Sequence, residues 1–242
     1  MAFSEPSSPF SPVSSLGQPL FPSFAPKRFD LIVFDWDGTI INSTGLIAEC
    51  IQLAAAEVGF PVPTTVEAKH IIGLSLQQSI EGLFPTMSAA DYARFAAAFR
   101  AHYVPRDDEP PLYNGIPELL DSLRHPERFL AVATGKPRLG LERAFGYTGL
   151  KPHFHFTRTA DEGLPKPHPD MLFKLMEFTG VSPERVLMIG DTTHDLALAK
   201  NAGVAAVGVT YGAHAAHKLT QLPHEVIVDD VAQLAAWLHQ HA

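Results

Sequence analysis

Short apolar runs that alternate with helical patterns are the feature that most restricts the fold of this chain. The runs cover residues 29–34, 129–134, 185–190, 205–210 and 225–228. Continuous apolar runs of this length are typical of strands that are buried on both faces, as in a parallel sheet. Helical patterns are found at residues 116–123, 137–145, 169–178, 194–201 and 231–239. This alternation predicts an α/β fold with a Rossmann-like parallel sheet.

One long interval, residues 43–112, interrupts the alternation with helical patterns alone. Apolar residues from Leu46 to Ala54 recur at helical spacing, and Gly59 is placed to end that helix. Further helices are predicted at residues 76–83 and from Ser88 to about Tyr103, followed by a polar, proline-stiffened linker over residues 104–112. We therefore expect an all-helical domain of residues 43–112 inserted into an α/β core formed by residues 29–42 and 113–242.

The N-terminal segment has a different composition from the rest of the chain. Residues 1–26 contain six prolines and seven serines. Proline fixes φ and removes a backbone donor, so this composition favours neither a helix nor a central strand. We predict that residues 1–28 form a flexible extension.

Charge and cysteine content exclude several classes of protein. The chain has 18 Lys+Arg against 26 Asp+Glu, a net charge of −8, and no basic block, which argues against a nucleic-acid partner. A membrane-spanning helix needs ~20 consecutive apolar residues, and no run is that long. The single cysteine, Cys50, cannot form a disulfide within the chain, which favours a reducing, cytoplasmic location.

Acidic side chains follow two of the predicted strands. Asp35 and Asp37 come after the first strand, and Asp191 and Asp195 come after the fourth. Ligand sites in open α/β sheets lie at the carboxyl ends of the strands, so these acids should meet at one edge. Two carboxylates ~4 Å apart repel by about 4 kcal/mol at an effective dielectric constant near 20. A cluster of such oxygens therefore calls for a hard cation, and Mg²⁺ is the expected cofactor.

Other polar residues at the same edge suit a phosphate ester. Thr134 and Gly135 end the second strand, and Lys166 lies between two prolines. A carboxylate can attack phosphorus to form an aspartyl-phosphate, while hydroxyl, ammonium and backbone N–H groups around residues 36–38 and 135 neutralise phosphate oxygens. A second acid two residues away can protonate the leaving alkoxide and then activate water.

These residues, in this order, resemble the four motifs of the haloacid dehalogenase superfamily. The motifs are Asp35-x-Asp37-Gly38-Thr39, Thr134, Lys166 and Gly190-Asp191-x-x-x-Asp195. The helical insert resembles the C1 cap of that superfamily. Residues 134–137, 166–170 and 207–212 are similar to its phosphoglycolate phosphatase branch. The resemblance covers residues 29 to about 230.

The resemblance implies a role for each matching residue. Asp35 would be the nucleophile and Asp37 the general acid/base. The metal would be held by Asp35, Asp191 and the carbonyl of Asp37, with Asp195 acting on it directly or through water. Substrate or phosphate would be bound by Trp36, Gly38, Thr39, Thr134, Gly135 and Lys166. One departure is Gly135-Lys136, where this branch often has Asn-Lys.

The expected function is an Mg²⁺-dependent phosphomonoester hydrolase acting on a small phosphorylated metabolite such as 2-phosphoglycolate. A phosphosugar mutase or a pyrophosphatase of the same superfamily is an alternative, because the core does not distinguish water from a sugar hydroxyl as acceptor. A phospho-accepting receiver domain is an alternative from another class. In the cap, Gly73-Leu74-Ser75 matches a substrate-facing loop loosely, and Lys69, His70 and Arg94 are candidate contacts. The oligomeric state stays open.

Overall fold

A six-stranded parallel sheet forms the centre of the structure, a computed structural model that describes residues 29–242. Its strands are β1 (Leu31–Phe34), β2 (Phe129–Thr134), β3 (Phe156–Thr159), β4 (Val186–Gly190), β5 (Ala205–Val209) and β6 (Val226–Val228). Their order is β3-β2-β1-β4-β5-β6, so β1 lies between β2 and β4. The predicted α/β fold with a parallel sheet is thereby confirmed. The predicted extension, residues 1–28, lies outside the described residues.

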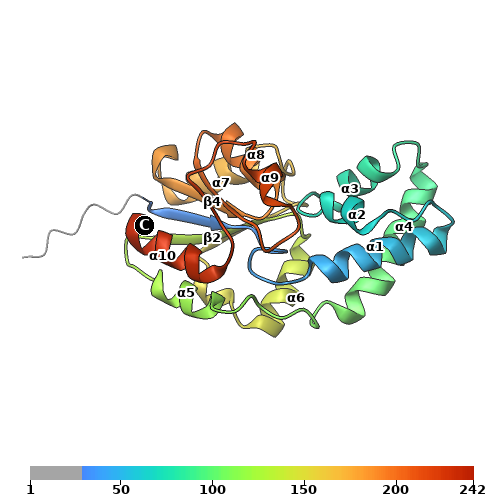
Figure 1. The fold of residues 1–242 in the computed structure, drawn as a ribbon, viewed down its shortest axis with the longest axis horizontal. Coiled ribbons are helices and arrows are strands. Elements are labelled where there is room, and N and C mark those ends of the chain that lie inside the picture. The colour runs from blue at the N-terminus through green and yellow to red at the C-terminus, as the bar shows by residue number, and fades with distance from the viewer. Residues whose placement is uncertain (1–28) are drawn as a thin grey trace, which may run out of the picture.

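Helices cover both faces of this sheet (Figure 1). One face carries α5 (Ile116–Ser122), α6 (Arg138–Thr148) and α10 (Val231–His241), and the other carries α7 (Asp170–Thr179), α8 (Thr193–Ala202) and α9 (Ala216–Leu219). Side chains alternate along a strand, so β1 supplies both layers. Ile32 and Phe34 pack in the first core, Leu31 and Val33 in the second, and all four are fully buried. No helix within residues 29–242 is long and apolar enough to span a bilayer.

The edge strand β3 is a strand that the sequence analysis did not predict. Its sequence, Phe-Thr-Arg-Thr, is polar, and three of its four side chains are only partly buried. An edge strand pairs on one side only, so it needs no continuous apolar run. The other five strands begin and end within two residues of their predicted limits.

Four α-helices lie between β1 and α5 and form a lobe beside the sheet (Figure 1). They are α1 (Thr44–Val58), α2 (Thr65–His70), α3 (Leu76–Leu83) and α4 (Ala89–Tyr103). The lobe has its own apolar cluster, in which Ile51, Phe84 and Phe95 are buried. Gly59 ends α1 with φ +79°, as its position predicted. The short helix α2 was not predicted, although Thr64 and Glu67 form a capping box at its start.

The segment predicted as a linker is more ordered than its composition indicates. It opens with a short 3₁₀ helix, Val104–Arg106. The next residue, Asp107, is only 6% exposed and accepts a 2.7 Å hydrogen bond from Arg143 of α6. The return from the helical lobe to the sheet is therefore tied to the core by an ion pair rather than left as a solvated connection.

Candidate active site

Three buried carboxylates meet at the carboxyl edge of β1 and β4. These strands pair in register, with Phe34 opposite Ile189, so Asp35 and Asp191 leave the sheet side by side. Asp195 joins them from the first turn of α8, where the backbone N–H and the hydroxyl of Thr192 donate to it at 3.1 and 2.6 Å. One carboxylate oxygen from each of Asp35, Asp191 and Asp195 lies within 4.8 Å of the other two. The predicted motif acids are thus brought together, with the exception of Asp37.

Lys166 bridges two of these carboxylates from the segment between β3 and α7. Its Nζ donates to Asp35 Oδ1 at 2.8 Å and to Asp195 Oδ1 at 2.6 Å, and its side chain is completely buried. Burial works against the ammonium charge, but the two carboxylates more than offset it, so the pKa of Lys166 lies above its ordinary value. The side chain therefore stays cationic inside the protein.

Asp191 is oriented by two donors from distant parts of the chain. Thr39 Oγ1 donates to Asp191 Oδ1 at 2.9 Å, and the backbone N–H of Ala213 donates to Oδ2 at 2.7 Å. Burial and then the charge of Asp195 raise the pKa of Asp191 to about 7. Burial also raises the pKa of Asp35 well above its ordinary value, although Lys166 opposes this shift. One ammonium is therefore not enough charge to balance three buried carboxylates.

The donor set fits a hard divalent cation such as Mg²⁺. Asp35 Oδ2 is buried and has no hydrogen-bond partner within residues 29–242, which leaves it available to a ligand. Glycines allow the backbone to approach the other two acids closely. A Cβ at Gly38 or Gly212 would lie 2.1 Å from Asp191 Oδ2, and one at Gly190 would lie 2.3 Å from Asp195 Cβ. Carboxylate oxygens packed this closely match the ligand chemistry of Mg²⁺.

Asp37 lies apart from this cluster and pairs with a second lysine. Its Oδ1 accepts hydrogen bonds from Ser43 Oγ at 2.7 Å and from Lys136 Nζ at 3.0 Å. Lys136 Nζ also donates to the hydroxyl of Tyr103, on α4, at 2.7 Å. Burial opposes the charge of Lys136, but Asp37 and Tyr103 outweigh it and raise the pKa of this lysine. No role was predicted for Lys136 from the sequence, although this residue directly follows Thr134-Gly135 at a strand end.

The loop from β2 to α6 carries Thr134, Gly135 and Lys136 and meets the helical lobe. The backbone N–H of Lys136 donates to Thr134 Oγ1 at 3.2 Å. Gly135 has no room for a side chain, because a Cβ there would lie 2.5 Å from the carbonyl oxygen of Leu74 and 2.7 Å from that of Gly73. Glycine in place of asparagine at this position thus allows the 73–74 loop to rest on the core.

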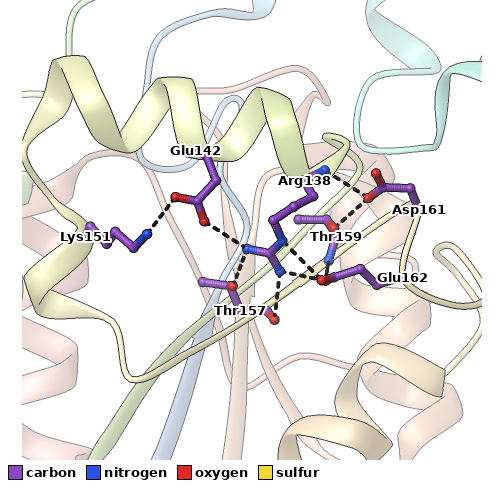
Figure 2. Close-up of polar contacts among 7 residues, drawn as sticks. All are labelled: Arg138, Glu142, Lys151, Thr157, Thr159, Asp161 and Glu162. Carbon is purple, nitrogen blue, oxygen red and sulfur yellow. Dashed lines mark hydrogen bonds and ion pairs between the residues drawn. The ribbon is translucent and has the colours of Figure 1, made fainter.

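The end of this loop is fixed by Arg138, the first residue of α6 (Figure 2). Its guanidinium donates to Thr157 Oγ1 at 2.7 Å and to Glu162 Oε2 at 2.6 Å, and its backbone N–H donates to Asp161 at 2.9 Å. Thr159, on β3, donates through its hydroxyl to Asp161 at 2.7 Å. The network therefore joins α6 to β3 immediately beyond the loop that carries Lys136.

A cavity of about 220 Å³ lies between the core and the helical lobe. At its core end it is lined by Asp35, Asp37, Thr134, Gly135 and Lys136. The other predicted site residues do not line it: Trp36, Gly38, Thr39, Lys166, Asp191 and Asp195. The Trp36 ring is fully buried and packs on Phe145, with ring centroids 5.1 Å apart, so its side chain belongs to the core.

Among the residues predicted to contact substrate from the cap, two loop residues line the cavity and the three basic residues do not. Gly73 and Leu74 line the cavity, whereas Ser75, Lys69, His70 and Arg94 do not. Arg94 is largely exposed and pairs with Asp91 on its own helix. His70 stacks on His214, with ring centroids 4.9 Å apart. The backbone carbonyl of His70 accepts from His194 Nε2 and His214 Nε2, each at 3.0 Å, so His70 is a contact between lobe and core.

Comparison with known proteins gives consistent matches. Residues 32–209 match the family described as haloacid dehalogenase-like hydrolase. A phosphoglycolate phosphatase of Vibrio vulnificus is 31% identical over 219 residues, covering 86% of this chain and 95% of that protein. A 5'-nucleotidase of Pseudomonas aeruginosa is 32% identical over 223 residues, covering 90% and 99%. The crystal structure of a hydrolase from Pseudomonas syringae has the same fold, with a TM-score of 0.81 at 20% identity, covering 88% and 99%.

The family match spans both the sheet and the helical lobe, and the two relatives align over most of their own length. The names of these two relatives, phosphoglycolate phosphatase and 5'-nucleotidase, refer to different substrates. The chain belongs to the haloacid dehalogenase-like hydrolases, and it is a phosphatase of that family.

Proposed function

We propose that this protein is an Mg²⁺-dependent phosphomonoester hydrolase that works through an aspartyl-phosphate on Asp35. The proposal rests on the hydrogen bonding and burial of the Asp35 carboxylate. Its Oδ1 is held by Lys166, whereas its buried Oδ2 accepts no hydrogen bond within residues 29–242 and the residue lines the cavity. A buried carboxylate oxygen that lacks a partner, on a residue that lines a cavity, is available to react with a ligand or to bind a cation.

The residues that would hold the metal are the carboxylates of Asp35, Asp191 and Asp195 and the backbone carbonyl of Asp37. When bound, Mg²⁺ would neutralise phosphoryl oxygens and relieve the repulsion among the three carboxylates. Lys166 keeps Asp35 and Asp195 in place, and Thr39 and Ala213 orient Asp191. These contacts fix the carboxylates before substrate arrives.

In the proposed reaction, an oxygen of Asp35 forms a bond to phosphorus as the bond from phosphorus to the ester oxygen breaks. Asp37 gives its proton to the departing alkoxide. Asp37 then takes a proton from water, the water oxygen bonds to phosphorus, and the bond to Asp35 breaks to release phosphate. Thr134, Gly135 and Lys136 line the same end of the cavity and would position the phosphoryl group.

We assign different roles to the two domains. The α/β core of residues 29–42 and 113–242 would carry the chemistry, and the helical domain of residues 43–112 would act as the cap over it. The substrate is a small phosphorylated metabolite, and 2-phosphoglycolate is the first reference compound because relatives such as the Vibrio protein carry that activity in their name. The family assignment favours this function over a receiver-type signalling domain.

Trapping the phosphoenzyme tests the proposal. The protein is mixed with Mg²⁺ and a phosphate ester, quenched in acid within one turnover, digested and analysed by mass spectrometry. We expect one added phosphoryl group on the peptide that contains Asp35, no such group in Asp35→Asn, and no turnover for either protein after chelation of Mg²⁺. Phosphate release that persists in a folded Asp35→Asn protein would contradict the assignment.

A further inference from the structure

We propose that the preferred substrate is the phosphate ester of an apolar alcohol or phenol, with an organic group of about six carbons. This inference rests on the proposed function and names the substrate class for the same site. It follows from the wall of the cavity that lies opposite the carboxylates. The helical lobe lines that wall with aliphatic and aromatic side chains, among them Ile47, Ile51, Ile71, Ile72, Leu76 and Phe99.

The polar side chains of the helical lobe that reach the cavity are already engaged or hydrated. Ser79 Oγ donates to the carbonyl of Ile71 at 3.0 Å, and the Tyr103 hydroxyl accepts from Lys136 at 2.7 Å. On the core side, Arg143 Nε donates to Asp107 at 2.7 Å, and the Arg143 side chain is 33% exposed. Arg100 also lines the cavity, but it is exposed, so its charge is solvated without a ligand. The walls therefore offer an organic group apolar contacts and few open hydrogen-bonding positions.

A polar organic group would lose water in this cavity without regaining partners. Leaving one buried hydroxyl unsatisfied lowers affinity about 5- to 100-fold, and a carboxylate loses more. A phosphosugar carries several hydroxyls, and 2-phosphoglycolate carries a carboxylate. Both would therefore bind less tightly here than an apolar ester with the same phosphate.

The volume of the cavity sets the size of the apolar group. A dry cavity of roughly 150 Å³ with apolar walls can hold benzene. At about 220 Å³, the present cavity admits a phenyl or hexyl group with room for the phosphoryl end. A two-carbon group would leave much of the wall uncovered.

A homologous series of alkyl phosphates tests the proposal. Ethyl, butyl and hexyl phosphate have leaving groups of nearly equal acidity, so differences in kcat/KM report on burial of the chain. Each buried methylene should raise kcat/KM about fourfold, and hexyl phosphate should exceed ethyl phosphate by about two orders of magnitude. Hexyl phosphate should also exceed 2-phosphoglycolate and glucose 6-phosphate.

Two leucines on α3 provide a matched pair of variants. Leu76 and Leu83 are both half-buried, and only Leu76 lines the cavity. Leu76→Ser should lower the hexyl-to-ethyl ratio of kcat/KM about tenfold, whereas Leu83→Ser should leave that ratio unchanged. Equal ratios in the two variants would overturn the proposal.

Direct binding separates this inference from the proposed reaction. Calorimetry with ethylphosphonate and hexylphosphonate, which cannot be hydrolysed, should show at least tenfold tighter binding of the longer compound. If no ester is hydrolysed while hexylphosphonate binds tenfold more tightly, the proposed function fails and the apolar subsite stands. If Asp35-dependent hydrolysis is flat along the series, or fastest with 2-phosphoglycolate, the reaction stands and the apolar subsite is refuted.

Discussion

The two ends of the cavity are built in opposite ways. At the core end, polar groups are paired over long sequence distances, as in Asp35 with Lys166 and Asp37 with Lys136. At the other end, the helical lobe presents mainly aliphatic and aromatic side chains. Paired charges fix the positions of the groups they join, whereas apolar contacts favour ligands of matching size and shape and impose no direction. From this contrast we propose that the core determines the reaction and the helical lobe determines which ester is accepted.

The strongest test of the core end is Asp37→Asn. This change keeps the size of the side chain and removes its ability to exchange a proton. We expect kcat to fall about 10²- to 10⁴-fold. The loss should be similar for ethyl and hexyl phosphate, because the acid acts on the ester oxygen and not on the organic group. Steady-state kinetics with both esters measures this, and a loss confined to one ester would contradict the division between the two ends.

The ion pair between Lys136 and Asp37 should matter less than the acid itself. Lys136→Met removes a charge-assisted hydrogen bond and leaves Asp37 with Ser43 as its partner. A bond of this kind is worth about 1.5–3 kcal/mol, so kcat should fall about 10- to 100-fold. Lys200→Met, at an exposed position of α8, serves as the control for loss of one lysine. Activity of Lys136→Met within twofold of the wild type would show that this pair has no part in the reaction.

Magnesium should stabilise the core end more as the pH rises. The folded-state pKa of Asp191, about 7, lies above its unfolded value. In the metal-free protein its stabilising contribution is therefore complete below pH ~4 and is lost as the pH rises through about 7. Bound Mg²⁺ needs ionised carboxylates, so its effect runs the other way.

Thermal unfolding with Mg²⁺ or with a chelator measures this difference. At saturating metal we expect Tm to rise by about 5–10 °C at pH 8.5 and by less at pH 5.5. Asp191→Asn, which cannot ionise, should reduce the pH dependence seen with the chelator. An equal rise in Tm at both pH values would contradict a carboxylate metal site.

Arg138→Ala should have the smallest effect of these variants, and we expect it to lower the free energy of unfolding. The guanidinium joins α6 to β3 through Thr157 and Glu162 (Figure 2). Its side chain is 31% exposed, so we expect a loss of about 1 kcal/mol in the free energy of unfolding. Arg124→Ala, which breaks the exposed pair with Asp121, is the control and should cost less than about 0.5 kcal/mol. Denaturant unfolding that ranks the two variants in the reverse order would refute this view.

Elements that bury an apolar face were predictable from the sequence, and elements held by polar or local contacts were not. The central strand β1 is apolar on both faces and was placed within two residues. In contrast, β3 carries Thr157 and Thr159, and α2 has only six residues, too few to show a helical period. The capping box of Thr64 and Glu67 marks the start of α2, but a prediction based on apolar periodicity alone does not detect it.

The same distinction applies to the site. Asp35, Asp191, Asp195 and Lys166 stand in recognisable motifs, and the structure brings them into contact. The ion pair of Asp37 with Lys136 could not be predicted from a motif, because it depends on how two loops at the strand ends lie against each other. The N–H of Ala213 that holds Asp191 is a backbone donor, which every residue type except proline supplies. The apolar wall is assembled from α1, α3, α4 and the 71–74 loop, and no single motif marks it.

The most direct test of the central claim is the ratio of kcat/KM for hexyl phosphate to that for ethyl phosphate, measured in the wild type, Lys136→Met and Leu76→Ser. We expect Lys136→Met to lower both values and keep the wild-type ratio, and Leu76→Ser to lower the ratio about tenfold. A ratio that collapses in Lys136→Met, or that survives in Leu76→Ser, would contradict the separation of reaction and selection between the two ends of the cavity.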